Sequence, residues 1–153
     1  MQAQNRKNYL EMIENSCGSR MFRNLYLQDK NGFIFDAVEK GNLGCGFYVS
    51  AVLKIFDKIG GLHATVSGTE KDLLENGWKE IVPGKWPDDL AKGDILVWEK
   101  SVIGDGNGHE HIGFFIGEEW AISNSSENGF PIKHHYQFGG GRRITKVLRA
   151  KWL

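Results

Sequence analysis

Two residues far apart in the sequence, Cys45 and His111, have the chemistry and the settings that nucleophilic catalysis requires. Residues 42–61, NLGCGFYVSAVLKIFDKIGG, predict a helix with an N-cap at residue 42 and Cys45 in its first turn. The free N–H groups and the positive dipole end of a helix start stabilise a thiolate, so we expect a lowered thiol pKa. His111 opens the strand-like run HIGFFIG, where an imidazole can accept the thiol proton. The pair predicts a cysteine hydrolase, although Cys45 also suits a small apolar side chain in the core.

Two glycines, Gly44 and Gly46, flank the expected nucleophile. Because they carry no side chain, we expect an open approach to the sulfur and backbone N–H groups that face an incoming carbonyl. We therefore assign Gly44 and Gly46 to the substrate-binding surface. Two further residues, His109 and Trp98, are assigned to the same surface because they flank the expected strands of the site.

A third polar residue is needed to fix the tautomer of the His111 ring. If residues 118–119 form a two-residue turn, counting back along a regular ladder places Asn124 on the face of His111. A turn one residue longer places Ser123 there instead. An amide oxygen is the better acceptor for a ring N–H, so Asn124 is preferred and Ser123 remains the alternative.

The elements that must position these residues form helices early in the chain and strands later. A capping box at Ser67 and Glu70 predicts a brief helix that ends at Gly77. We expect an earlier helix over 7–17, a hairpin over 25–35, and strands over 78–82, 95–98, 111–117, 120–124, 131–136 and 143–152. This order predicts a single α+β domain, residues 1–153, with an antiparallel sheet packed against helices and the cysteine-bearing helix at the cleft.

Composition narrows the function classes. The chain has 153 residues, with 19 Lys and Arg balanced by 19 Asp and Glu, so no overall charge points to nucleic acid or to a membrane surface. Two cysteines do not make a disulfide framework, and the polar start of the sequence lacks a signal peptide. We expect a cytoplasmic protein, or one exported by another route, and a monomer.

A metal or anion site is the alternative use of the histidines. Neighbouring histidines on a strand can chelate a metal, and the thiol of Cys45 adds a possible ligand, yet the chain has no HExxH spacing and no second cysteine nearby. We therefore expect no metal and no cofactor. Short basic clusters on a neutral chain are usually solvated surface rather than phosphate or RNA sites. The residues concerned are His109, His111, Lys133, His134, His135, Arg142 and Arg143.

Four segments, GCGFYVSAVL, KGDILVW, HIGFFIG and WAISNSS, together resemble the NlpC/P60 superfamily of papain-like cysteine peptidases over residues 41–126. The resemblance implies a papain-like fold, Cys45 as nucleophile and His111 as base. The third residue of the family, often a histidine, aligns with Ser123, next to Asn124. The oxyanion tyrosine of the family has only weak matches here, Tyr26 and Tyr48.

The resemblance also implies a substrate, because the family most often cuts peptidoglycan stem peptides. It predicts a stem-peptide endopeptidase or amidase that works through an acyl-enzyme, with a peptide or cell-wall substrate. In this sequence Gly44 and Gly46 stand where the family usually has Asp and Ser, which marks a divergent branch. The alternative is a non-catalytic binding module on the same fold that recognises cell-wall or protein ligands.

Overall fold

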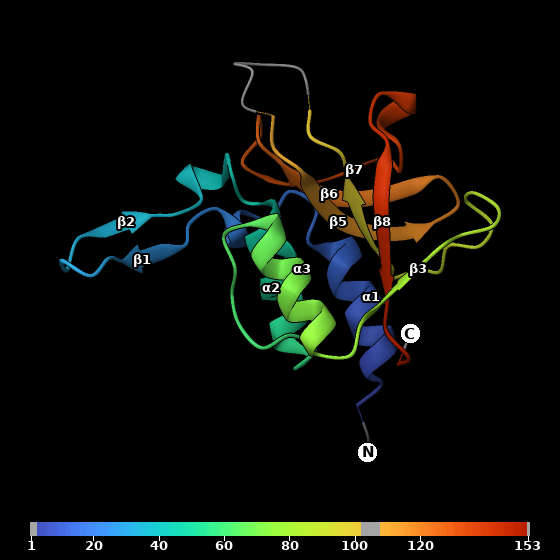
Figure 1. Ribbon diagram of the computed structural model, residues 1–153, viewed down its shortest axis with the longest axis horizontal. Helices are drawn as coiled ribbons and strands as arrows, with labels where there is room; N and C mark the ends of the chain where they lie inside the picture. The colour runs from blue at the N-terminus through green and yellow to red at the C-terminus, as the bar shows by residue number, and fades with distance from the viewer. Residues whose placement is uncertain (1–2, 102–107, 153) are drawn as a thin grey trace.

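The computed structural model describes residues 3–101 and 108–152, and in these residues three α-helices accompany a six-stranded and a two-stranded sheet (Figure 1). The chain is a mixed α+β protein, as the sequence predicts. The helices are α1 (Asn5–Asn15), α2 (Cys45–Ile55) and α3 (Val66–Glu75). The strands are β1 (Tyr26–Gln28), β2 (Ile34–Asp36), β3 (Lys79–Ile81), β4 (Ile95–Trp98), β5 (His111–Gly117), β6 (Trp120–Ser125), β7 (Phe130–His135) and β8 (Ile144–Arg149).

The large sheet is antiparallel throughout, in the order β3-β8-β4-β5-β6-β7. The last strand, β8, lies between β3 and β4 rather than at an edge. Strand β5 is central, and its residues are buried from Ile112 to Gly117. Its first residue, His111, is held by pairing with Trp98 of β4.

The two faces of the sheet carry separate apolar clusters. Ile112 and Phe114 of β5 point to the face on which α1 and α2 pack, with α3 packed against α2. Phe115 points to the opposite face, where Trp98 and Tyr136 also lie. Successive side chains of a strand alternate between faces, so His111 belongs to the face of Phe115 and Trp98.

The helix boundaries differ from the predicted ones at their caps. Helix α2 begins at Cys45 with Gly44 as its N-cap, because Asn42 lies in the preceding turn and its amide donates to Glu39 Oε2 at 3.2 Å. It ends at Ile55, before the expected Gly60–Gly61 stop.

Helix α3 starts earlier than the capping box predicts. Thr65 Oγ1 accepts from the N–H of Gly68 at 3.1 Å and caps the helix. The expected partner in the box, Glu70, instead accepts from Lys146 Nζ at 2.6 Å. Both residues of the predicted pair, Ser67 and Glu70, therefore lie inside the helix.

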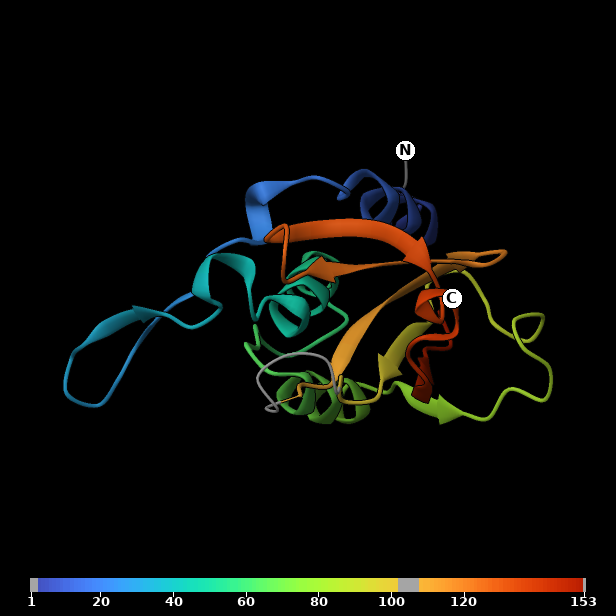
Figure 2. The ribbon, with the colours of Figure 1, turned by 90° about the horizontal axis from the view of Figure 1, so that it is seen from above.

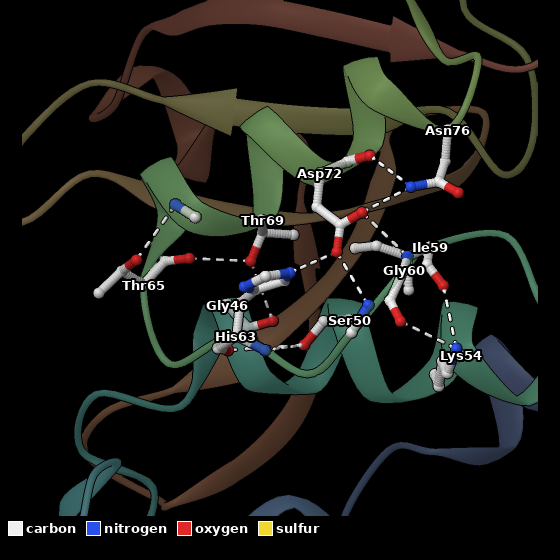
Figure 3. A network of polar contacts seen from close by, with 12 residues as sticks. Gly46, Ser50, Lys54, Ile59, Gly60, His63, Thr65, Thr69, Asp72 and Asn76 are labelled. Atoms are coloured by element: carbon white, nitrogen blue, oxygen red, sulfur yellow. Dashed lines mark hydrogen bonds and ion pairs between the residues drawn. The ribbon is translucent and has the colours of Figure 1, made fainter. Parts of the chain in front are cut away.

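The loop between α2 and α3 is fastened by Asp72 (Figure 3). Its carboxylate accepts from the N–H groups of Gly60 at 2.9 Å and Gly61 at 2.8 Å, and lies 2.5 Å from Nε2 of His63. The N–H of His63 donates to Ser50 Oγ at 3.0 Å, which joins the loop to α2 as well. His63 is therefore a structural residue that joins the loop to both helices.

A buried ion pair fixes the entry to β4. Asp94 is fully buried, and its two carboxylate oxygens accept from Arg149 Nε at 2.7 Å and Nη2 at 2.6 Å. The N–H of Ala91 donates to the same carboxylate at 2.8 Å. The aspartate of the KGDILVW segment thus anchors β4 to β8.

The hairpin of β1 and β2 extends away from the body of the molecule (Figures 1 and 2). Its turn, around Asn31 and Gly32 as predicted, is held by Asp29 Oδ1, which accepts from the N–H of Asn31 at 2.8 Å and of Phe33 at 2.9 Å. The side chains of Tyr26, Phe33 and Ile34 are largely exposed. In the described part of the chain, no helix has the length and apolar character needed to cross a bilayer.

Candidate active site

A β-bulge between β5 and β6 decides which residue faces His111. The turn is as expected, since Gly117 pairs with Trp120, but Phe115 then pairs with Ala121. Ile116 is therefore an extra residue on β5, and a bulge of this kind shifts the register by one position. The prediction of a regular ladder, which favours Asn124, is therefore wrong, because Gly113 pairs with Ser123.

The shifted register brings Ser123 to the His111 ring. Ser123 Oγ lies 2.7 Å from Nε2 of His111, and the serine is buried. Asn124 points elsewhere: its Nδ2 donates to the backbone oxygen of Gly41 at 2.7 Å, and its side chain lies beside Gly44. Of the two alternatives for the third residue, the structure brings Ser123 into contact with the ring.

The thiol of Cys45 lies beside the residue that follows His111. The ladder of β5 and β6 runs from Gly113 and Ser123 onward, so the N–H of Ile112 lies ahead of it and is directed at Cys45. The N–H groups of Cys45 and Gly46 also face the sulfur, as expected at a helix start. Cys45 is partly exposed and packs against the rim of the main core cluster.

The pKa of Cys45 differs from the sequence prediction. Burial raises the pKa of the thiol, and this effect outweighs the lowering by the N–H groups of Ile112 and Gly46 and by the Arg142 guanidinium. The predicted lowering of the thiol pKa is therefore wrong for the free protein. At this helix start the cost of burying a charged sulfur exceeds the stabilisation that the N–H groups and Arg142 give to the thiolate.

His111 is likewise held in its neutral form. Burial, together with smaller electrostatic contributions from Arg142 and His134, lowers the pKa of His111 to about 3. Its ring lies against Trp98, with centroids 5.6 Å apart, and Phe138, 5.9 Å apart. The free protein thus holds both the thiol of Cys45 and the imidazole of His111 in their neutral forms.

Both glycines beside the thiol serve close packing rather than open access. Each is buried, and a Cβ on Gly44 would lie 2.9 Å from Nδ2 of Asn124. A Cβ on Gly46 would lie 2.7 Å from the backbone oxygen of Thr65, at the contact of α2 with α3. The prediction that they open a path for substrate is therefore wrong.

The two other residues assigned to the substrate-binding surface, Trp98 and His109, differ in solvent exposure. Trp98 is fully buried, and its Nε1 donates to the backbone oxygen of Tyr136 at 2.7 Å. It therefore forms a floor beneath the histidine rings, and its assignment to the substrate surface is wrong. His109 is exposed, and its backbone oxygen accepts from Nη2 of Arg142 at 2.5 Å, which places it at the rim.

The site also contains residues to which sequence reasoning gave other roles or none. Arg142 is half-buried, donates to the backbone oxygen of Glu99 at 2.8 Å, and lies near Cys45. Its guanidinium carbon stands 5.9 Å from the Phe138 ring centroid. Arg142 and Phe138 both follow β7 in the chain. The only sequence feature that pointed to this segment is a basic residue next to a run of glycines. His134, considered in the sequence only for metal or anion binding, lies 2.8 Å from Ser123 Oγ.

Other expected or possible sites lie elsewhere. Tyr26 is exposed on the hairpin, whereas Tyr48 is buried and bonded to Ser16 at 2.7 Å, so neither is an oxyanion donor at the thiol. A hollow of about 420 Å³, lined in part by Phe115 and Glu118, lies at the opposite end of β5 from His111. Within residues 3–101 and 108–152, no three His, Cys, Asp or Glu side chains are grouped as metal ligands.

No protein-family model matches the sequence, and no curated protein matches it significantly. The residues of the site and their surroundings are therefore the basis for assigning a function.

Proposed function

We propose that this protein is a cysteine hydrolase that cleaves amide bonds through Cys45 and His111. The observation that carries the proposal is the placement of the thiol beside the Ile112 N–H, one residue from a histidine whose Nε2 bonds Ser123. Acyl transfer requires a nucleophile, a base and a third group that orients the base, and we assign these parts to Cys45, His111 and Ser123.

The neutral resting state determines how the reaction would start. Because the thiol pKa is raised and the imidazole pKa lowered, a stable ion pair is not the resting form. The thiol proton moves to His111 as sulfur attacks the carbonyl, and the N–H of Cys45 stabilises the oxyanion. The positive charge of Arg142 favours the same step, because negative charge develops near it.

The second half of the cycle needs only the same residues. His111, now protonated, gives its proton to the leaving amine, and the Cys45 thioester remains. A water activated by His111 then hydrolyses the thioester and restores the thiol. From the resemblance to the NlpC/P60 superfamily, we further propose a papain-like fold and a peptidoglycan stem peptide as the substrate. The protein would then act as a stem-peptide endopeptidase or amidase.

A non-catalytic binding module on the same fold is the second candidate. The observation that favours it is the neutral thiol and imidazole in the free protein, since a binding site needs neither charge. Such a module would recognise a cell-wall or protein ligand without forming a covalent intermediate.

Digestion of purified peptidoglycan, with released fragments identified by mass, tests the proposal. Wild-type protein should release stem-peptide fragments, and Cys45→Ser should release none while it keeps the wild-type melting temperature. Cys17→Ser is the matched control, because Cys17 is an exposed thiol beyond the end of α1, and it should digest like wild type. Activated acyl donors separate the two candidates further. Failure of every donor to label Cys45 would favour the binding module.

A further inference from the structure

A hydrogen-bonded chain of three side chains runs from His111 across β6 to β7. Ser123 Oγ lies between two imidazoles, 2.7 Å from Nε2 of His111 and 2.8 Å from Nε2 of His134. On the far side, Nδ1 of His134 lies 2.8 Å from the backbone oxygen of His135. The chain thus ends on a carbonyl group.

That carbonyl fixes the direction of every bond in the chain. A carbonyl oxygen can only accept, so Nδ1 of His134 must carry a proton. Burial lowers the pKa of His134, although the His135 carbonyl opposes this, so the ring is neutral near pH 7. Its Nε2 is therefore an acceptor, and the hydroxyl of Ser123 donates its hydrogen bond to it.

The hydroxyl has one proton, so its remaining role toward His111 is determined. Ser123 Oγ must accept from His111, which places the proton of that ring on Nε2. The other nitrogen, Nδ1 of His111, then carries the lone pair that a base needs. Without an acceptor beyond it, the hydroxyl is free to turn and donate to Nε2, which would move the His111 proton to Nδ1.

Aromatic contacts hold both rings in this arrangement. His134 stacks on Phe138 with centroids 4.0 Å apart and an interplanar angle of 16°. Trp98 lies against both imidazoles, 5.6 Å from that of His111 and 5.7 Å from that of His134. Ring rotation, which would exchange the roles of the two nitrogens, is therefore opposed by packing.

We propose that His134 is a positioning residue, which acts through Ser123 to hold His111 as the Nε2–H tautomer with Nδ1 as the base. The consequence for turnover rests on the proposed hydrolase function. The tautomer itself is a property of the free protein and is measurable without substrate.

Long-range ¹H–¹⁵N spectra of protein labelled at histidine test the proposal, since protonated and bare ring nitrogens differ widely in ¹⁵N shift. At pH 7.5 we expect Nδ1–H for His134 and Nε2–H for His111. His134→Phe keeps an aromatic ring on Phe138 but removes the acceptor, so the Nε2–H fraction of His111 should fall. His134→Gln supplies an amide oxygen and should restore it. Lys133→Gln, an exposed neighbour on β7, is the matched control and should change nothing.

Turnover should follow the tautomer. Because a base contributes roughly 10²–10⁴-fold to rate, we expect His134→Phe to lower kcat by about 10- to 100-fold with little change in KM. His134→Gln should recover most of the loss. A purely structural role would instead lower the melting temperature of both variants and leave the His111 tautomer of the folded protein unchanged.

The outcomes separate this inference from the hydrolase proposal. An Nδ1–H tautomer of His111 in the wild-type protein, or an unchanged tautomer in folded His134→Phe, overturns the inference even if wild-type protein cuts peptidoglycan. The expected tautomers and their response to substitution support it even if no acyl donor labels Cys45, in which case the hydrolase proposal fails alone. If His134→Phe does not fold, an Nδ1–H tautomer of His111 in the wild-type spectrum, or loss of the Nε2–H tautomer in folded His134→Gln, still overturns the inference.

Discussion

The ionisation of Cys45 yields the sharpest prediction, because two resting states give different pH profiles. A preformed thiolate–imidazolium pair is ionised well below neutral pH, so alkylation by neutral iodoacetamide would be nearly constant from pH 5 to pH 8. Burial raises the pKa of Cys45, so the thiolate is a minor species throughout that range. Its fraction, and hence the alkylation rate, should rise about tenfold per pH unit, or about 1000-fold from pH 5 to pH 8.

The assay uses Cys17→Ser protein, in which Cys45 is the remaining thiol, with the adduct followed by intact mass. The slope of the profile is compared rather than the absolute rate, because a thiolate of lower pKa is also a weaker nucleophile. A plateau that begins below pH 7 would refute the reasoning from burial. It would show that the helix start and His111 lower the pKa of the Cys45 thiol by more than burial raises it.

Arg142→Met refines the same experiment. The guanidinium lowers the pKa of Cys45 against the effect of burial, so its loss should slow alkylation by about 2- to 10-fold at each pH below the thiol pKa. Arg143→Met is the control, since Arg143 is exposed and pairs with Glu99 at 3.3 Å. Equal slowing in both variants would mean that the effect is general charge rather than the position of Arg142.

Three further predictions concern stability, measured as the free energy of unfolding in urea. Gly46→Ala should cost about 1–3 kcal/mol, because its Cβ meets the Thr65 carbonyl, whereas Gly61→Ala, with neighbours no nearer than 3.9 Å, should be nearly neutral; equal losses would contradict the packing argument. Asp94→Ala should cost about 1.5–3 kcal/mol, because Arg149 and the Ala91 N–H lose a buried charged acceptor while water can still reach the partly exposed guanidinium, and a loss under about 0.5 kcal/mol would disprove this. Burial raises the pKa of Asp72, but the hydrogen bonds that its carboxylate accepts lower the pKa by more, so the folded pKa lies below the unfolded value. Its contribution is therefore complete above about pH 4 and is lost as the pH falls through the folded pKa, so the deficit of Asp72→Asn should shrink in acid, and a deficit independent of pH would argue against it.

The sequence predicts the elements well because their apolar patterns are local. HIGFFIG gives a buried strand from its own residues, and Asn31 with Gly32 gives the hairpin turn. The caps are less certain, because a Thr at 65 and a Ser at 67 satisfy the same local rule. Glu70, the expected partner of Ser67, pairs instead with Lys146, which is far away in the sequence and which no local rule predicts.

The candidate site is harder to predict because its decisive features are not local. A bulge at Ile116 has no distinctive residue pattern, yet it pairs Gly113 with Ser123 instead of Asn124 and so decides which residue faces His111. Arg142 and Phe138 reach the site from the loop before β8, which the spacing of Cys45 and His111 does not reveal. The thiol pKa depends on burial, which is known only after the fold brings these segments together.

The position of β8 between β3 and β4 also determines when the sheet can form during synthesis. Both neighbours leave the ribosome before β8 does, so each presents an open edge until the last strand arrives. The contact of β3 with β8 spans residues 79 to 149, and such distant pairings form slowly. The ion pair of Asp94 with Arg149 likewise cannot form until β8 has been synthesised. We therefore expect the large sheet to close only after β8 has been synthesised, and chains that still lack β8 to be prone to edge-to-edge association.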